Sequence, residues 1–351
     1  MSPPKQPILF LTSPEHGQSN VALSVAEEFL HRGEFEIHIA SFKELSTRVQ
    51  AINDKPGTGS GYPYPLPWRL ILANMYMVFC FGWIVRFGKP IRDLLEIRKK
   101  AGIRTTFPHV APYCENHLHL SPSFREMDFP LHVPDNVISC GPIVRSFSSL
   151  IESDPALDSW LKEPTILICL GSHVQAPEDD AMQMAMAIQA VVHEFPNMQV
   201  LWKLKYDWES SPKVKNILGP LVNSDKARIF PWIQPEIISI LEGGNIVAYV
   251  HHGGANSFFE ACKAGTPQVI LPQWFDTYDC PARVEWLGIG LHGSRNVAPK
   301  INGSELSSAL LRVIKDKEIQ RRARVIGDLC KTTEGRVLAH DQIVQYVQKE
   351  L

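Results

Sequence analysis

The chain has 351 residues, and 44% of them are hydrophobic, which is enough for two domains that each bury a core. Its 35 Lys and Arg residues are balanced by 37 Asp and Glu residues, so no surplus charge indicates a nucleic-acid partner. Seven cysteines without metal-type pairing, and an N-terminus without a long apolar run, predict a cytoplasmic protein with no secretory signal.

The N-terminal stretch predicts the opening of a parallel sheet. An apolar strand over Ile8–Thr12 is followed by a polar turn, a helix over Asn20–His31 and a second strand over Phe35–Ala40. His16 lies in that turn, at the carboxyl end of the first strand, where open sheets bind ligands. Imidazole titrates near neutral pH and can take a proton from an alcohol, so His16 is either a general base or a solvated loop histidine.

An uncharged apolar run covers residues 70–85, between Arg69 and Arg86. It follows a stretch, residues 55–67, that holds too much Gly and Pro for regular structure. A membrane-spanning helix needs about 20 apolar residues, so the run predicts a buried or acceptor-lining helix, or a helix that lies on a membrane surface. An amphipathic helix with a basic end is expected over Pro90–Ala101.

One group of residues has the chemistry of metal ligands, namely His109, Cys114, His117 and His119. Their spacing matches no zinc pattern, and loop histidines are usually solvated. The sequence therefore predicts no metal site.

From Thr165 onward the chain alternates between short apolar strands and helices, which predicts a parallel α/β sheet. The first part ends at Gly141-Pro142, and residues 143–164 are expected to link the two parts. A Gly171-Ser172 turn after the first strand of the second part is able to bind phosphate. The expected strands are Thr165–Leu170, Gln199–Leu204, Arg228–Pro231, Ile246–Val250 and Gln268–Leu271, and the expected helices are Glu178–Phe195, 256–264, Ser304–Ile314, Glu318–Cys330 and Arg336–Lys349.

The turn after the fourth of these strands reads His251-His252-Gly253-Gly254-Ala255-Asn256-Ser257. Its two glycines let the backbone approach a ligand closely, and Asn256 and Ser257 are expected to cap the following helix, whose start attracts anions. His252 is able to offer a phosphate a hydrogen bond or a partial positive charge. Glu260, one turn along the helix, suits ribose hydroxyl groups. Trp232 offers a flat face to a base, and Asp276-Thr277 offers polar groups to a sugar.

This block resembles the donor-binding signature of the UDP-dependent glycosyltransferases, family 1 of the GT-B superfamily, and within it the fungal branch. The resemblance rests on a Trp, a His-x-Gly-x-Asn-Ser run and a Glu four residues after the Asn, in fixed order. It implies that the Trp stacks on uracil, the run holds the diphosphate and the Glu binds the ribose. The residues that it assigns to the donor are Ser172, Trp232, Gln234, His252, Gly254, Asn256, Ser257, Glu260, Asp276 and Thr277.

The chain departs from the family pattern at two places. The pair that reads the sugar hydroxyls is usually Asp-Gln and is Asp276-Thr277 here, which leaves the sugar open, with UDP-glucose as the expected donor. The usual Trp-x-Pro-Gln is replaced by Trp232-Ile233-Gln234-Pro235, which leaves the role of Gln234 open.

The resemblance also implies a fold and a reaction. The fold is GT-B, with two Rossmann-like domains that face each other across a cleft, and the first of them is reduced here, as if an internal block were missing. The expected parts are residues 1–142, the linker 143–164, the UDP-sugar domain 165–335 and a terminal helix, 336–351, that crosses back to the first domain.

His16 matches the family's general base by position. The implied reaction is inverting transfer of a hexose from a UDP-sugar to a hydroxyl of a small apolar acceptor, without a cofactor. Two alternatives stay open, a UDP-sugar-binding remnant without turnover and the donor half of a two-chain, membrane-associated transferase.

Overall fold

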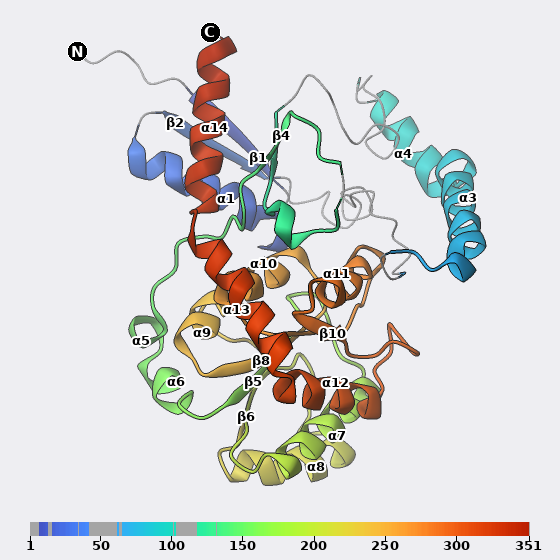
Figure 1. The fold of residues 1–351 in the computed structure, drawn as a ribbon, viewed down its shortest axis with the longest axis vertical. Helices are drawn as coiled ribbons and strands as arrows, with labels where there is room; N and C mark the ends of the chain where they lie inside the picture. Colours follow the sequence, from blue (N-terminus) through green and yellow to red (C-terminus); the bar gives the residue numbers. More distant parts are fainter. Residues whose placement is uncertain are drawn as a thin grey trace.

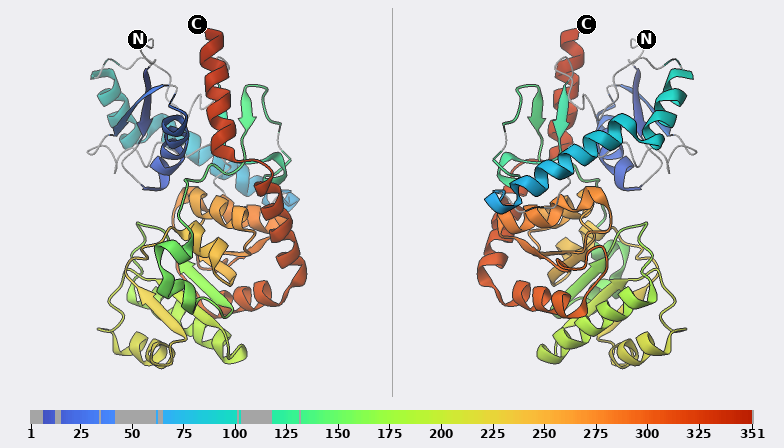
Figure 2. Two further views of the ribbon diagram at one scale, coloured as in Figure 1. Left: turned by 90° about the vertical axis from the view of Figure 1, so that its left-hand side faces the viewer. Right: turned by 90° about the vertical axis from the view of Figure 1, so that its right-hand side faces the viewer.

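The computed structural model describes residues 7–12, 16–33, 35–41, 62, 65–100, 102, 118–130 and 132–350. Figure 1 shows two bodies, one above the other. The lower one, here called the sheet region, comprises residues 150–334. The upper one, here called the front region, comprises the described residues of 7–142 together with the terminal helix α14 (Gly335–Glu350), which stands above the sheet region in both views of Figure 2.

A six-stranded parallel sheet with the order β10-β9-β8-β5-β6-β7 organises the sheet region. The chain builds one side of the sheet outward from β5 and then returns to the other side of β5 with β8, so the order reverses between these two strands. Open parallel sheets bind ligands beyond the carboxyl ends of their strands at such a reversal. The strands are β5 (Thr165–Cys169), β6 (Gln199–Lys203), β7 (Ala227–Phe230), β8 (Ile246–His251), β9 (Gln268–Ile270) and β10 (Gly290–His292).

Helices cover this sheet on both faces, which is why its central strand β5 is buried along its whole length. One face packs on α7, α8 and α12, and the other packs on α5, α6, α9 and α10. The helices of the region are α5 (Leu150–Ser153), α6 (Pro155–Trp160), α7 (Glu178–Glu194), α8 (Pro212–Asn223), α9 (Ile237–Gly243), α10 (Ala255–Ala264), α11 (Asp279–Leu287), α12 (Gly303–Lys315) and α13 (Lys317–Lys331), with the 3-10 turn η3 (Phe275–Thr277).

The front region has a much smaller sheet. Strands β1 (Pro7–Thr12) and β2 (Glu36–Ser41) pair in parallel, and helix α1 (His16–Arg32) connects them, as the sequence predicts. Helix α14 packs on α1, where Phe29 contacts His340 at 4.1 Å between ring centroids and Arg32 bonds Asp341 at 2.9 Å. A second two-stranded parallel sheet joins β3 (His119–Ser121) to β4 (Val137–Ser139).

The expectation that residues 70–85 form a buried helix is wrong. They belong to α3 (Ile71–Phe87), which lies between the 3-10 turn η1 (Trp68–Leu70) and α4 (Lys89–Lys100) at the side of the molecule (Figure 1). The apolar side chains of α3 are exposed, with Leu72 at 78% and Tyr76 at 69%. An apolar composition shows that burial would stabilise a helix, but it does not show that another element packs against that helix. Within the described residues, no helix has the length and apolar character to cross a bilayer.

The front region contacts the sheet region where α1 lies against α10 and through a 3-10 turn. The 3-10 turn η2 (Arg125–Met127) inserts Met127, which is fully buried, into a core of α10, α11 and α13, and the neighbouring Asp128 pairs with Arg283 at 3.2 Å. Within the front region, the chain enters α14 through Gly335, where a Cβ would lie 2.4 Å from the carbonyl oxygen of Pro142. The backbones therefore cross in direct contact.

Candidate functional site

The turn between β8 and α10 lies at the point where the strand order reverses. Gly253 has a φ of +91°, and a Cβ on it would lie 2.9 Å from the carbonyl oxygen of Thr277, so only glycine fits there. Helix α10 begins from Gly254 as its N-cap, with no side-chain capping bond. The expectation that Asn256 and Ser257 cap this helix is therefore wrong. Among the described residues, no side chain caps the first N–H groups of α10, which suits an anion-binding helix start.

His252 is held in a slot between two glycines. A Cβ on Gly171, which follows β5, would lie 2.7 Å from the imidazole Cε1, and a Cβ on Gly254 would lie 2.4 Å from Nε2. Burial, with help from His173 and Lys203, lowers the pKa of His252 to about 4. Its Nδ1 is buried and has no hydrogen-bond partner among the described residues. The ring is thus neutral at pH 7, and one of its nitrogens is not used by the fold.

The preceding histidine, His251, has a different role. Its Nδ1 accepts a hydrogen bond from the Gly253 amide at 3.1 Å, so its Nε2 carries the proton and donates to Gln268 at 2.9 Å. Burial lowers the pKa of His251 to about 3, which keeps the ring neutral. Through its hydrogen bond with the Gly253 amide, His251 fixes the backbone of the turn. The sequence analysis gave this residue no role, although its position as the last residue of a buried strand was a usable signal.

Asn256, Ser257 and Glu260 lie on the first turns of α10. The Ser257 hydroxyl accepts a hydrogen bond from the buried Tyr249 hydroxyl at 3.2 Å. Asn256 and Glu260 line one pocket. Burial, and then the nearby Glu236, raise the pKa of Glu260 to about 8, so this carboxyl holds its proton at neutral pH.

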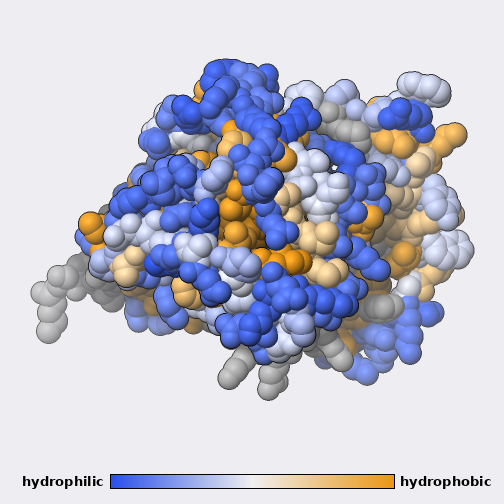
Figure 3. Space-filling view, turned by 90° about the horizontal axis from the view of Figure 1, so that it is seen from below, coloured by the Kyte–Doolittle hydropathy of each residue, from blue (hydrophilic) through white to orange (hydrophobic). Residues whose placement is uncertain are grey.

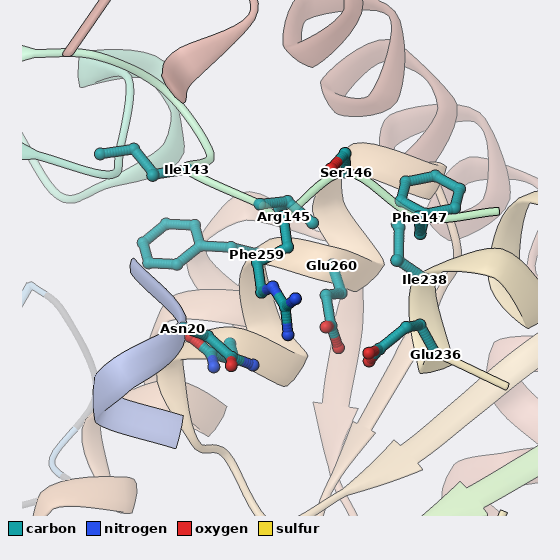
Figure 4. Close-up of a pocket in the computed structure, with 11 residues that line it drawn as sticks. Asn20, Ile143, Arg145, Ser146, Phe147, Glu236, Ile238, Phe259 and Glu260 are labelled. Atoms are coloured by element: carbon teal, nitrogen blue, oxygen red, sulfur yellow. The ribbon is translucent and has the colours of Figure 1, made fainter. Parts of the chain in front are cut away.

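The same pocket is closed from above by the front region and the linker. Figure 4 shows Asn20 of α1 and Arg145 of the linker on the side opposite Glu236 and Glu260. Residue 16 is the first residue of α1, one helical turn before Asn20, but its side chain lies outside the described residues. The start of α1 therefore faces α10 across the pocket.

Trp232 lies beyond the carboxyl end of the edge strand β7, with the exposed Gln234 in the same loop. The ammonium of Lys203 lies 3.8 Å from the Trp232 ring centroid, and that of Lys205 lies 5.8 Å away. Lys205 also donates to the carbonyl oxygen of Ser172. Three strand spacings, about 14 Å, separate β8 from β7 along this edge of the sheet.

The Asp276-Thr277 pair lies in η3, next to the β8–α10 turn. Thr277 is 3% exposed. Its hydroxyl accepts hydrogen bonds from the amides of Gln273 and Trp274, both at 3.1 Å, and donates to the Trp274 carbonyl at 2.7 Å. This hydroxyl is therefore used within its own turn, and Asp276 is the exposed member of the pair.

The predicted site residues thus fall into three places along one sheet edge. Those of α10 and its turn lie together, Ser172 lies across the strand reversal from them, and Trp232 with Gln234 lies at the far end. Of the four residues considered as metal ligands, His109, Cys114 and His117 lie outside the described residues, and His119 is the first residue of β3. Within the described part, no three His, Cys, Asp or Glu side chains form a group able to hold a metal ion.

Comparisons with known proteins fit this geometry. The family model of the UDP-glucoronosyl and UDP-glucosyl transferases matches residues 101–333. The glycosyltransferase sdnJ of Sordaria araneosa is 35% identical over 309 residues, which are 80% of this chain and 60% of that protein. The 2-hydroxyacylsphingosine 1-beta-galactosyltransferase of Homo sapiens is 28% identical over 215 residues, which are 60% of this chain and 35% of that protein. The chain thus spans less than two thirds of the length of both relatives.

Solved structures share the fold at low sequence identity. The glycotransferase of kitacinnamycin aligns with a TM-score of 0.65 at 14% identity, over 97% of this chain and 99% of that one. The calicheamicin glycosyltransferase CalG4 aligns with a TM-score of 0.63 at 17% identity, over 98% of this chain and 99% of that one. The predicted GT-B fold is confirmed, with a small front region.

Proposed function

Because the chain belongs to the UDP-glucoronosyl and UDP-glucosyl transferase family, we propose that it transfers a hexose from a UDP-sugar to a hydroxyl group of a small apolar acceptor, with inversion. One observation carries the proposal. At the strand reversal, two glycines hold a neutral imidazole, with a buried nitrogen that the described residues leave unpaired, beside a helix start without a side-chain cap. A backbone of this shape suits a diphosphate.

The donor lies along the sheet edge. The diphosphate rests on the start of α10, near Gly254, Asn256 and Ser257, and the ribose lies near Glu260. The base lies toward Trp232. Since His252 is neutral in the free protein, it contributes a hydrogen bond, and the positive charge comes from Lys203 and Lys205 near Trp232 and from Arg145 above the pocket.

The acceptor enters from the front region. His16, at the start of α1, removes the proton of the acceptor hydroxyl as its oxygen attacks the anomeric carbon on the face opposite to UDP. The bond between the sugar and the β-phosphate breaks, and the N–H groups of α10 and the nearby cations stabilise the charge on the departing UDP. Attack from the opposite face inverts the anomeric configuration.

An apolar acceptor is supported by a relative and by the surface of the chain. The name of one relative includes a sphingolipid, 2-hydroxyacylsphingosine. Within the described residues, the front region presents its largest apolar side chains on η1 and α3, where Trp68 is 85% exposed.

A screen of several UDP-sugars for UDP release, run beside calorimetric titration with UDP, tests the proposal. We expect micromolar UDP binding and release of UDP from at least one donor when an acceptor is present. Binding without release over a broad acceptor panel would favour the remnant without turnover. Release only after a second protein co-purifies would favour a two-chain transferase. Absence of UDP binding would contradict the proposed function itself.

We further propose that α3 contacts the cytoplasmic surface of a membrane, from which an apolar acceptor is collected. Its exposed apolar side chains, which include Leu72 and Phe79, are followed by a basic helix, α4, that ends in Arg98-Lys99-Lys100. Figure 3 shows apolar side chains at this edge of the molecule. Anionic lipid complements such a basic neighbour. All six described cysteines are free thiols, which suits the cytoplasm.

Flotation with vesicles that contain anionic lipid tests this contact. The double variant Leu72→Glu and Phe79→Glu should lose most of its vesicle binding, because charged groups on α3 oppose its insertion into the lipid interface. Val325→Glu is the matched control, since Val325 is an exposed apolar residue on a different helix, α13. Equal flotation of the double variant and the wild type would contradict the role of α3.

A further inference from the structure

We propose that Glu236 is a second ribose-binding residue, and that Glu236 and Glu260 together bind the two hydroxyl groups of the UDP ribose. The inference rests on the proposed function and adds to it a residue outside the signature that the sequence analysis identified. It predicts a site that reads both the 2′- and the 3′-hydroxyl and therefore selects ribonucleotides strongly.

The geometry places the two carboxyl groups on one pocket from different elements. Glu260 extends from the second turn of α10, and Glu236 is the N-cap residue of α9. Both line the pocket, and Figure 4 shows their carboxyl groups pointing toward each other. Glu236 lies only four residues after Trp232. The loop that carries the expected platform for the base thus also carries Glu236, and a ribose lies directly beside its base.

Neither carboxyl group is used by the fold. In the described part of the chain, all hydrogen bonds to Glu236 go to its backbone carbonyl, and neither side chain has a hydrogen-bond or ion-pair partner. Two carboxyl groups that face each other without donors are unfavourable, and the effect is visible in the raised pKa of Glu260. Hydroxyl groups of a ligand would supply the missing donors, and a vicinal diol supplies two of them.

The rest of the pocket fits a ribose that leads to a diphosphate. Arg145 lies on the other side of Glu260 from Glu236 (Figure 4), so a positive charge lies beside the acidic pair. Asn256, at the start of α10, lines the same pocket. The diphosphate is therefore expected at this end of the pocket, next to the ribose. Phe259 and Ile143 provide apolar walls for the face of the sugar ring.

Titration with three nucleotides tests the inference. UDP, 2′-deoxy-UDP and 3′-deoxy-UDP are bound to the wild type and to the variants Glu236→Gln and Glu260→Gln, and the dissociation constants are compared as ratios. We expect the wild type to bind each deoxynucleotide about 10-fold or more weakly than UDP, because each missing hydroxyl removes one hydrogen bond to a carboxyl group of the pocket. In Glu236→Gln the ratio for one deoxynucleotide should fall to about 2 while the other ratio stays high. Glu260→Gln should show the converse.

Two further variants make the outcome decisive. Glu242→Gln, on the same helix as Glu236 but outside the pocket, should keep both wild-type ratios. Glu236→Asp, which keeps a carboxylate, should recover part of the lost discrimination. If Glu236→Gln binds all three nucleotides with the wild-type ratios, the role of Glu236 is wrong while the proposed function stands. If the wild type does not bind UDP, the proposed function itself fails.

Discussion

The sheet region and the front region differ in how firmly they hold the groups that they bring to the cleft. In the sheet region, helices cover both faces of the six-stranded sheet, and the turn at its strand reversal is fixed from below by His251 and from the side by Gly171. The front region has one small buried cluster among its described residues, formed by Val25, Phe29, Cys140, Ile143 and Ala339. Its helix α3 leaves its apolar side chains exposed.

This difference teaches that the two steps of transfer make different demands. Binding a diphosphate by backbone N–H groups requires a rigid turn, because these groups cannot reorient. Receiving an acceptor and removing one proton requires a single correctly placed base and an adaptable apolar surface. We therefore expect donor binding to depend on the sheet region, and turnover to depend also on the start of α1.

The substitution His16→Ala separates these roles most sharply. We expect kcat to fall by about 100- to 10,000-fold, because the acceptor hydroxyl loses its general base, while the dissociation constant for UDP stays unchanged. His31→Ala, at the other end of α1, is the control and should keep wild-type turnover. Turnover by His16→Ala equal to that of the wild type would assign the base to another residue. Loss of UDP binding would show that the front region also holds the donor.

The substitution Met127→Ala tests whether the two regions are independent. Met127 belongs to the front region by sequence but is fully buried in the core of the sheet region, where the Cys330 sulfur lies 3.7 Å from its own. We expect the free energy of unfolding, measured in urea, to fall by about 2–4 kcal/mol because a cavity remains. Met186→Ala, at an exposed site on α7, should change it by less than about 0.5 kcal/mol. Equal effects would mean that η2 does not anchor the front region.

The sequence was sufficient for the sheet region because its signals are local. Apolar runs such as TILIC predict strands that are buried on both faces, and the structure confirms that all five residues of β5 are buried. The glycine turn was predictable as well, because Gly253 and Gly254 between a strand and a helix have few other uses. The structure orders these strands so that the Gly171 and His252 turns lie together.

The sequence was insufficient wherever a side chain had two available partners. Thr277 was expected to face a sugar, but its hydroxyl is used by the amides of its own turn, which the residue type alone could not show. Asn256 and Ser257 were expected as caps, yet the N-cap residue is Gly254, two residues before Asn256. The exposure of α3 was missed for a third reason, since burial depends on what lies beside a helix rather than on its own composition.

The substitution Gly171→Ala probes the slot around His252. The added methyl group would overlap the imidazole ring, and Gly171 has a φ of +84° that alanine adopts only with strain. We expect UDP to bind about 10- to 100-fold more weakly in calorimetry, because the ring must move into the site. Gly219→Ala is the control, since a Cβ there meets no atom within 4 Å, and it should leave UDP binding unchanged. Unchanged binding in both variants would remove His252 from the donor site.

The smallest expected effect is a pH dependence of stability that Glu260 introduces in the sheet region. Burial, and then Glu236, raise its pKa to about 8 in the folded state, from the ordinary value of 4.5 for Glu. Between about pH 5 and pH 8 the folded state therefore binds more protons than the unfolded state, and the free energy of unfolding falls as the pH rises. Glu260→Gln removes this pH-dependent contribution to the free energy of unfolding. The stability of this variant relative to the wild type should therefore be higher at pH 8.5 than at pH 5.5.

Thermal unfolding at the two pH values measures this difference. Glu318→Gln is the control, because Arg321 and Arg322 lower the pKa of Glu318 to about 2, so that this carboxyl is ionised in both states across the whole range. The shift in melting temperature caused by Glu318→Gln should thus be the same at pH 5.5 and pH 8.5. A Glu260→Gln shift that is equally independent of pH would mean that Glu260 is ionised in the folded protein. The ribose would then meet two carboxylates rather than a carboxylate and a carboxylic acid, and the base-to-ribose end of the site would carry one more negative charge than the structure predicts.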